Sequence, residues 1–179
     1  GRSSNFTGAP LPGYGAEGAW LLRPCGDALR PVQAELMARG LGLLVYDAYR
    51  PIRATEAMVV WAESTGNAHL LSEGYISRKS WHNRGNAIDL TIVNADTGAP
   101  LDMGTEWDAF HDGSHVANAT GVAEENRRIL HAIMEANGWK PYSKEWWHFS
   151  FPLDDAPRID VPYGREEQVH AQIGSSTPR

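Results

Sequence analysis

A single carboxylate within an apolar run restricts what this chain can fold into. Residues 87–93 read Ala-Ile-Asp-Leu-Thr-Ile-Val, which is typical of a buried strand, yet Asp89 stands near the centre. Burying an unpaired carboxylate costs roughly several kcal/mol. Asp89 therefore requires a cation, a dense set of hydrogen-bond donors, or exposure to solvent. The candidate cations within the same stretch are Arg84 and a cation that His82 helps to hold.

Hydrophobic periodicity predicts helices and short strands in alternation. Helices are expected at residues 30–39, 53–63 and 123–137, and strands at residues 43–46, 87–93, 99–103 and 145–151. Pro31 suits the first turn of the first helix, and the strand at 43–46 is expected to be buried. His131 is expected on the surface of the third helix. A long polar loop at 105–120 has the composition of a functional loop.

This mixture predicts an α+β fold with a small, mainly antiparallel sheet flanked by helices. With 179 residues, 42% of them apolar, the chain is long enough for one compact domain over residues 1–179. We expect an irregular N-terminal segment and a tail that frays after about residue 163. Cys25 stands alone, which excludes an internal disulfide and a cysteine-based zinc cage.

The charge pattern narrows the partners. The net charge is −6, and no lysine- or arginine-rich run is present, so neither nucleic acid nor an anionic membrane surface is an expected partner. No stretch approaches about 18 consecutive apolar residues, so no membrane span is expected. Small solutes or neutral polymers fit better, and no protein partner is inferred. The sequence leaves a cytoplasmic and a periplasmic or exported location both open.

Two histidines and two carboxylates have the types and spacings of a metal site. His82 and Asp89 are seven residues apart, and one continuous strand would aim them at opposite faces. The turn at Arg84-Gly85 removes this objection, because His82 can then lie on a loop that folds back over the strand. The alternative is an aspartate satisfied by backbone amides beside a surface histidine.

Residues 143–151, Ser-Lys-Glu-Trp-Trp-His-Phe-Ser-Phe, offer a third ligand. If the segment enters its strand through a turn, Glu145 and His148 reach one side. His148 then completes a three-ligand zinc site, and Glu145 supplies a base for a water whose pKa zinc lowers to about 7. The alternative is an ordinary aromatic core strand.

Arg50 follows the strand at 43–46 and precedes Pro51, which favours an extended or turned backbone. It is either a permanent cation with a rigid donor fork in a cleft, or the partner of Asp47 in a salt bridge. The residues alone leave both alternatives open. His115, in the polar loop, is a candidate for a supporting role near the site.

Five segments together resemble the VanX-type D-Ala-D-Ala dipeptidases, within the broader group of zinc D,D-peptidases. They are Asn-Phe-Thr-Gly-Ala-Pro-Leu-Pro-Gly-Tyr (5–14), Tyr-Asp-Ala-Tyr-Arg-Pro (46–51), Lys-Ser-Trp-His-Asn-Arg-Gly-Asn-Ala-Ile-Asp-Leu-Thr (79–91), Asp-Met-Gly-Thr-Glu-Trp-Asp-Ala-Phe-His-Asp-Gly-Ser-His (102–115) and Glu-Trp-Trp-His-Phe (145–149). They occur in the family's order and span most of the chain.

The resemblance implies a role for each matching residue. The zinc ligands are His82, Asp89 and His148, the general base and acid is Glu145, the oxyanion partner is Arg50, the ammonium anchor is Asp108, and the dipeptide pocket is lined by Tyr14 and Ser80. A stretch that usually precedes the first segment, with a pocket tyrosine, is missing here. Trp81 and Asn83 flank His82 where smaller residues are common. These departures bear on the strictness of the dipeptide preference and leave the hydrolytic core untouched.

The expected function is therefore hydrolysis of D-Ala-D-Ala, or a close D,D-dipeptide, by a bacterial enzyme with one Zn²⁺ per chain and a small dipeptide as its substrate. The first alternative is a peptidoglycan D,D-carboxypeptidase or endopeptidase with a more open cleft. The second is a non-catalytic zinc-binding module. Glu145 and Arg50 favour an enzyme, since a structural zinc needs neither a base nor an oxyanion partner.

Overall fold

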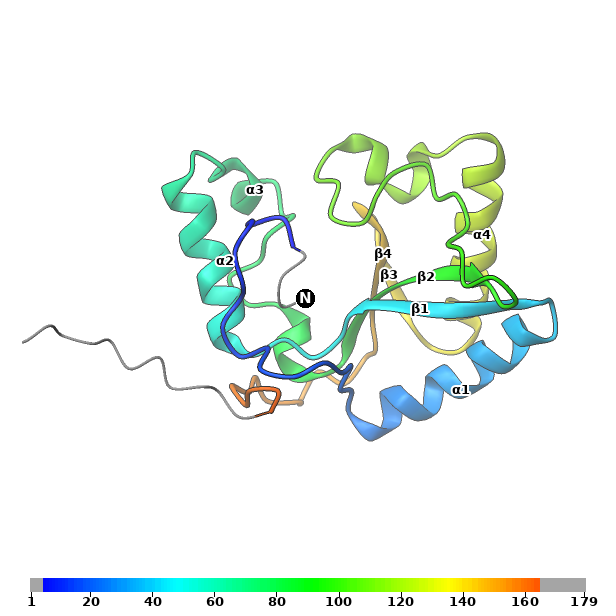
Figure 1. Ribbon diagram of the computed structural model, residues 1–179, viewed down its shortest axis with the longest axis horizontal. Coiled ribbons are helices and arrows are strands. Elements are labelled where there is room, and N and C mark those ends of the chain that lie inside the picture. Colours follow the sequence, from blue (N-terminus) through cyan, green and yellow to red (C-terminus); the bar gives the residue numbers. More distant parts are fainter. Residues whose placement is uncertain (1–4, 165–179) are drawn as a thin grey trace, which may run out of the picture.

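The computed structural model describes residues 5–164, and the tail expected to fray after about residue 163 lies almost entirely outside this range. The elements are α1 (Arg23–Met37), β1 (Leu41–Asp47), α2 (Ile52–Ser64), α3 (His69–Ser72), the 3-10 helix η1 (Trp81–Arg84), β2 (Ala87–Asn94), the 3-10 helices η2 (Asp112–Ser114) and η3 (Val116–Asn118), α4 (Gly121–Ala136), β3 (Lys140–Tyr142) and β4 (Glu145–Ser150) (Figure 1).

The four strands form one antiparallel sheet in the order β1-β2-β4-β3, which confirms the α+β prediction. In Figure 1, α2 and α3 lie on one side of the molecule, and α1 and α4 lie on the other with the sheet. Because β2 is an inner strand, Asp89 has a neighbour on each side. It pairs with His148 of β4 and with Asp47 of β1. The sheet thus brings three polar side chains of distant segments together.

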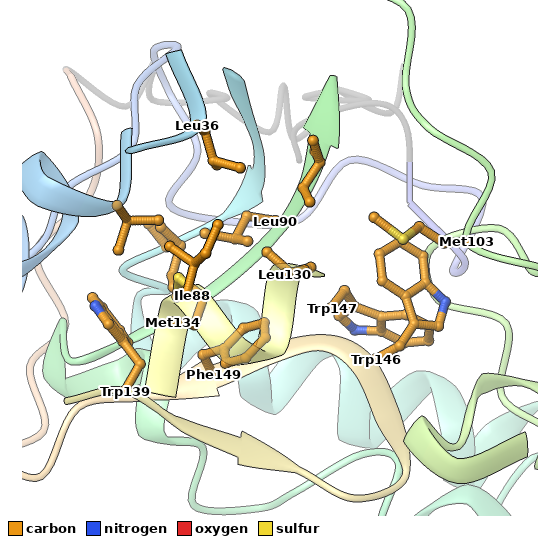
Figure 2. Packing of buried hydrophobic residues seen from close by; sticks show 14 of the residues in the cluster. Leu36, Ile88, Leu90, Met103, Leu130, Met134, Trp139, Trp146, Trp147 and Phe149 are labelled. Atoms are coloured by element: carbon orange, nitrogen blue, oxygen red, sulfur yellow. The ribbon is translucent and has the colours of Figure 1, made fainter. Parts of the chain in front are cut away.

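Alternation along β2 separates the core from the site. Ile88 and Leu90 are fully buried and pack with Leu130 and Met134 of α4, as Figure 2 shows. Each such side chain stabilises the fold by about 1.5–3 kcal/mol. Since neighbouring residues of a strand point to opposite faces, this packing turns Asp89 away from α4. A second cluster of buried residues lies around α2 and α3 and includes Tyr14, Tyr49, Met58 and Tyr163.

The helix α1 begins seven residues earlier than expected, at Arg23. Pro24 occupies its first turn, where a missing N–H costs nothing, and Pro31 lies inside the helix. The prediction that Pro31 starts the helix is therefore wrong. The buried face is Cys25, Val32 and Leu36, so the Val32–Leu36 stripe was identified correctly, and Cys25 extends it.

The prediction of a buried strand at 43–46 is also wrong, since Leu43 and Tyr46 are half-buried and the two residues between them are exposed. Leu44 and Val45 are 39% and 36% exposed, because β1 is one of the two edge strands of the sheet. The expected hairpin partner at 99–103 is reduced to one bridge between Val93 and Pro100. Two backbone hydrogen bonds flank this bridge, from the Asn94 N–H to the Ala99 carbonyl and from the Leu101 N–H to the Ile92 carbonyl, so Pro100 needs no N–H at this position.

His131 is buried, not on the surface as expected. Its Nε2 lies 3.0 Å from the carbonyl oxygen of Trp146, so this ring joins α4 to β4. Burial lowers the pKa of His131 and favours its neutral form. The buried face of α4 is therefore wider than the stripe formed by its hydrophobic residues.

Candidate active site

The turn around η1 places His82 over the strand β2. Ser80 caps η1 by accepting a hydrogen bond at its Oγ from the backbone N–H of His82, at 3.2 Å. Gly85 ends the turn with φ 71°, a left-handed conformation that glycine adopts without strain. The chain thereby reverses, and His82 Nε2 lies 3.3 Å from Asp89 Oδ1. This is the arrangement that the spacing of His82 and Asp89 required.

The second nitrogen of His82 is held by the backbone. Nδ1 lies 2.6 Å from the carbonyl oxygen of Ala48, and only an N–H can bond to that oxygen. In the neutral ring Nε2 is then the lone-pair nitrogen, and it points toward Asp89 and His148. Backbone carbonyls orient metal-binding imidazoles in this way.

Three ligand atoms from three segments form a small triangle. His82 Nε2, Asp89 Oδ1 and His148 Nδ1 are separated by 3.3, 2.9 and 3.2 Å. Zn²⁺ binds nitrogen and oxygen ligands at about 2.0–2.1 Å, which places neighbouring ligands of a tetrahedron about 3.3 Å apart. The triangle fits this ion, and the three residues form a group that can hold a metal.

Negative charge predominates at this triangle. Burial alone would raise the pKa of Asp89, but His82 and His148 beside it hold that pKa well below its usual range. Burial, followed by the charges of Asp89 and Asp108, raises the pKa of Glu145 well above its usual range. A bound dication offsets this crowding, which agrees with the metal site indicated by the triangle.

Glu145 stands at the beginning of β4, where the pairing with β3 is irregular. A straight strand would aim Glu145 and His148 at opposite faces, yet Glu145 Oε2 lies 3.8 Å from His148 Nδ1. Both residues line the same cavity. No described residue donates a hydrogen bond to the Glu145 carboxylate. A buried carboxylate with a raised pKa, beside a metal site, has the properties of a general base.

Arg50 satisfies both alternatives left open by the sequence. Its Nε and Nη2 lie 2.9 and 2.8 Å from Asp47 Oδ2, and Nη2 also lies 3.9 Å from Asp89 Oδ2. Burial lowers the pKa of Arg50, but the charge of Asp47 and weaker contributions from Tyr14 and Asp89 raise it above its usual range. Arg50 is thus a permanent cation, paired with Asp47 and also exposed to the cavity.

Tyr14 contacts the Arg50–Asp47 pair through Asp47. Its hydroxyl donates to Asp47 Oδ1 at 2.8 Å, and the backbone N–H of Ala48 donates to the same oxygen at 3.0 Å. Asp47 therefore accepts three hydrogen bonds, one of them from Arg50 Nε, and also forms an ion pair with Arg50 Nη2. Tyr14 is not among the described residues that line the cavity, so it contacts the site through Asp47.

A cavity of about 480 Å³ lies over the triangle and falls in the size range of small-molecule sites. It is lined by Arg50, Met58, Tyr75, Ser80, Trp81, His82, Asp89, Asp108, Phe110, Tyr142, Glu145 and His148, among others. Trp81 lies on this wall and is 40% exposed, with Arg84 over its ring. Asn83 points elsewhere, since its amide donates to the Arg50 carbonyl and the Thr55 hydroxyl.

Asp108 enters the cavity from the long loop between β2 and α4. Its φ of 60° is unusual for a residue with a side chain and indicates a backbone held by its surroundings. Burial, and then the charges of Asp89 and Asp47, raise the pKa of Asp108 to about 8. A cation bound beside Asp108 removes this penalty.

Two polar residues of this region were not assigned a role from the sequence. Asp47 was treated only as a possible partner of Arg50, although it is 7% exposed and holds Tyr14 as well. Tyr75 lines the cavity and bonds through its hydroxyl to His115 Nε2 at 2.8 Å. Asp47 directly follows the apolar run 43–46, and Asp89 lies within such a run. A carboxylate next to strand-forming apolar residues was the feature of the sequence that could have identified Asp47.

A triangle that can hold a metal ion, with a carboxylate and a guanidinium at the same cavity, is the arrangement expected of a metallopeptidase. The family model for D-Ala-D-Ala dipeptidases matches residues 3–168. The chain therefore belongs to the D-Ala-D-Ala dipeptidase family.

Two of the relatives that this chain resembles illustrate the family. A D-alanyl-D-alanine dipeptidase of Enterococcus faecalis is 37% identical over 89% of this chain and 83% of the relative. One of Streptomyces coelicolor is 33% identical over 88% and 84%. A solved structure of the vancomycin-resistance D,D-pentapeptidase VanY with Zn(II) is similar at 18% identity and a TM-score of 0.48, covering 77% of this chain and 76% of that one.

Proposed function

We propose that this protein hydrolyses D-Ala-D-Ala, or a close D,D-dipeptide, in a zinc-dependent reaction. The observation that carries this proposal is the triangle of His82, Asp89 and His148 with Glu145 and Arg50 at one cavity. Family membership supports the dipeptide as the substrate. When bound to the triangle, Zn²⁺ supplies a Lewis acid and lowers the pKa of a water to about 7.

The charged residues of the cavity match a small zwitterion. Asp108 provides a carboxylate for the ammonium of the dipeptide, and the ammonium in turn offsets the burial of Asp108. The carbonyl oxygen of the scissile bond lies toward Arg50, whose guanidinium neutralises the negative charge that develops there. Ser80, buried beside His82, lines the same pocket.

Glu145 moves the protons in this mechanism. Its carboxylate takes a proton from the attacking water and later gives it to the leaving amine. The burial of Glu145 beside the triangle suits both steps, because a carboxylate shielded from water is a stronger base than an exposed one. The isolation of this carboxylate from hydrogen-bond donors keeps it available for the water.

Asp47 and Tyr14 support the reaction without touching the substrate. Three hydrogen bonds and the ion pair with Arg50 Nη2 fix the Asp47 carboxylate, and through it the guanidinium of Arg50. A positioned cation stabilises developing charge better than a mobile one, since no reorganisation is needed during the reaction.

The experiment is a substrate comparison with zinc-loaded protein. D-Ala-D-Ala, L-Ala-L-Ala and a peptidoglycan stem peptide ending in D-Ala-D-Ala are incubated separately, and free alanine is measured. We expect rapid release from D-Ala-D-Ala and little from the other two. Release from the stem peptide at a comparable rate would favour a D,D-carboxypeptidase. No release from any substrate would favour a non-catalytic zinc-binding module.

A further inference from the structure

Arg127 of α4 is a buried cation outside the catalytic cavity. It is 2% exposed, and its guanidinium carbon lies 5.9 Å from the centre of the Trp146 ring. Burial lowers the pKa of Arg127, and the charge of Asp102 only partly offsets this. A buried charge is expensive, and an apolar side chain of similar size is often as stable in such a place. The presence of Arg127 therefore requires a reason beyond packing.

The guanidinium bonds to three backbone carbonyls. Nε donates to Met103 at 2.8 Å, Nη2 donates to Gly113 at 2.9 Å, and Nη1 donates to His115 at 2.7 Å. Met103 lies at one end of the segment 103–115, and Gly113 and His115 lie at the other. One side chain of α4 thus holds both ends of the loop.

Asp108 lies near the middle of this loop. Its left-handed backbone, with φ 60°, is a conformation that persists only when the surrounding structure enforces it. No β-strand lies within 103–115, so few backbone bonds hold the segment. The three bonds from Arg127 are therefore the main attachment of the loop to α4.

The same loop also contacts the opposite wall of the cavity. The His115 ring lies 2.8 Å from the Tyr75 hydroxyl, while its carbonyl accepts from Arg127. Tyr75 lines the cavity, as does Phe110 from the loop itself. Fixing the loop thus fixes the part of the cavity that surrounds Asp108.

We propose that Arg127 is a positioning residue for substrate binding, which holds the 103–115 loop so that Asp108 meets the substrate ammonium. The inference rests on the proposed function, because it takes the dipeptide as the ligand of Asp108. Arg127 touches neither the metal triangle nor Glu145. Its loss should therefore weaken ammonium recognition more than the chemical step.

The test compares Arg127→Met and Arg127→Lys with Arg128→Met in the zinc-loaded protein. Arg128 is the next residue of α4, but it is exposed and pairs with Glu125, so it is a matched control. Lysine keeps the charge but cannot bond to all three carbonyls at once. We expect both Arg127 variants to raise KM for D-Ala-D-Ala about tenfold or more, with kcat changed less. Bound zinc should be unchanged, and Arg128→Met should match the wild type.

A double substitution shows whether Arg127 acts through Asp108. In the Asp108→Asn background, Arg127→Lys should raise KM little further, because the ammonium anchor is already lost. Independent effects that multiply would overturn the inference, as would an unchanged KM in Arg127→Lys.

Hydrogen exchange gives a readout without turnover. In the metal-free protein, Arg127→Lys should speed exchange within 103–115, and Arg128→Met should not. Equal exchange in both would contradict the loop attachment. If the wild type itself releases no alanine from D-Ala-D-Ala, the proposed function fails, while exchange still decides whether Arg127 holds the loop.

Discussion

Replacing Asp47 tests whether the cation at the cavity must be held in place. Asp47→Ala removes the oxygen to which Arg50 Nε and Nη2 bond, at 2.9 and 2.8 Å. Hydrogen bonds between charged groups contribute about 1.5–3 kcal/mol, so Arg50 loses roughly 3 kcal/mol of positioning. If most of this loss is felt in the transition state, kcat falls on the order of 10²-fold, at about 1.4 kcal/mol for each factor of ten.

Where the released guanidinium goes adds to the effect. The nearest remaining carboxylate is Asp89, whose Oδ2 already lies 3.9 Å from Arg50 Nη2. Arg50 would then compete for a proposed metal ligand, so a modest loss of zinc should accompany the loss of rate. Asp47→Asn keeps the shape without the charge and should give an intermediate kcat.

The assay is steady-state kinetics on D-Ala-D-Ala, with bound zinc and the urea midpoint measured for each variant. Asp27→Asn is the control, because Asp27 pairs with Arg30 on the exposed side of α1. In an Arg50→Ala background, Asp47→Ala should lower kcat little further. A near wild-type kcat in Asp47→Ala, or fully independent effects in the cycle, would refute the idea that Asp47 works through Arg50.

Three further substitutions test other parts of the site. His148→Ala should lose zinc in elemental analysis, and zinc retained at the wild-type level would refute this ligand. Arg50→Lys should lower kcat by on the order of 10²-fold, since one ammonium cannot replace the guanidinium fork; unchanged kinetics would remove Arg50 from the mechanism. The pKa of Asp108 is raised from 3.8 to about 8, so its ionisation destabilises the metal-free fold, with no cost below about pH 4 and the full cost above about pH 8. Urea midpoints should therefore fall less with rising pH in Asp108→Asn, and parallel profiles would contradict this.

The residues near Asp89 could be predicted because a buried carboxylate has few physical solutions. Its apolar neighbours predict a buried strand, and a carboxylate within a buried strand requires a cation nearby. In the structure, two histidines and Arg50 lie within 4 Å of the Asp89 carboxylate. On a straight strand, the spacing would aim His82 and Asp89 at opposite faces, and likewise Glu145 and His148. As expected, the turn around η1 brings His82 to the side of Asp89, and the start of β4 brings Glu145 to the side of His148.

Other features depend on the arrangement of the elements, which local patterns do not contain. Leu44 and Val45 have the composition of a buried strand, and only the strand order makes β1 an edge. His131 and Arg127 look like surface residues of a polar helix face. Their partners are backbone carbonyls of β4 and of the loop before α4, which carry no side-chain signal.

Asp47 shows the limit most clearly. The sequence offered the Asp47–Arg50 pair as an alternative to a functional arginine, as if one excluded the other. In the structure the pair is what directs Arg50 toward the cavity. A salt bridge that the sequence suggests as an alternative to a functional role can instead hold the functional residue in place.

The most direct measurement is alanine release from D-Ala-D-Ala by the wild type and by Glu145→Gln, at equal bound zinc. Glutamine keeps the size of Glu145 but cannot take a proton, and general acid–base catalysis contributes roughly 10²–10⁴-fold. We expect both proteins to bind one zinc per chain, with Glu145→Gln slower by at least about 10²-fold. Equal rates would show that another group activates the water, and loss of zinc from Glu145→Gln would make Glu145 a ligand instead of a base.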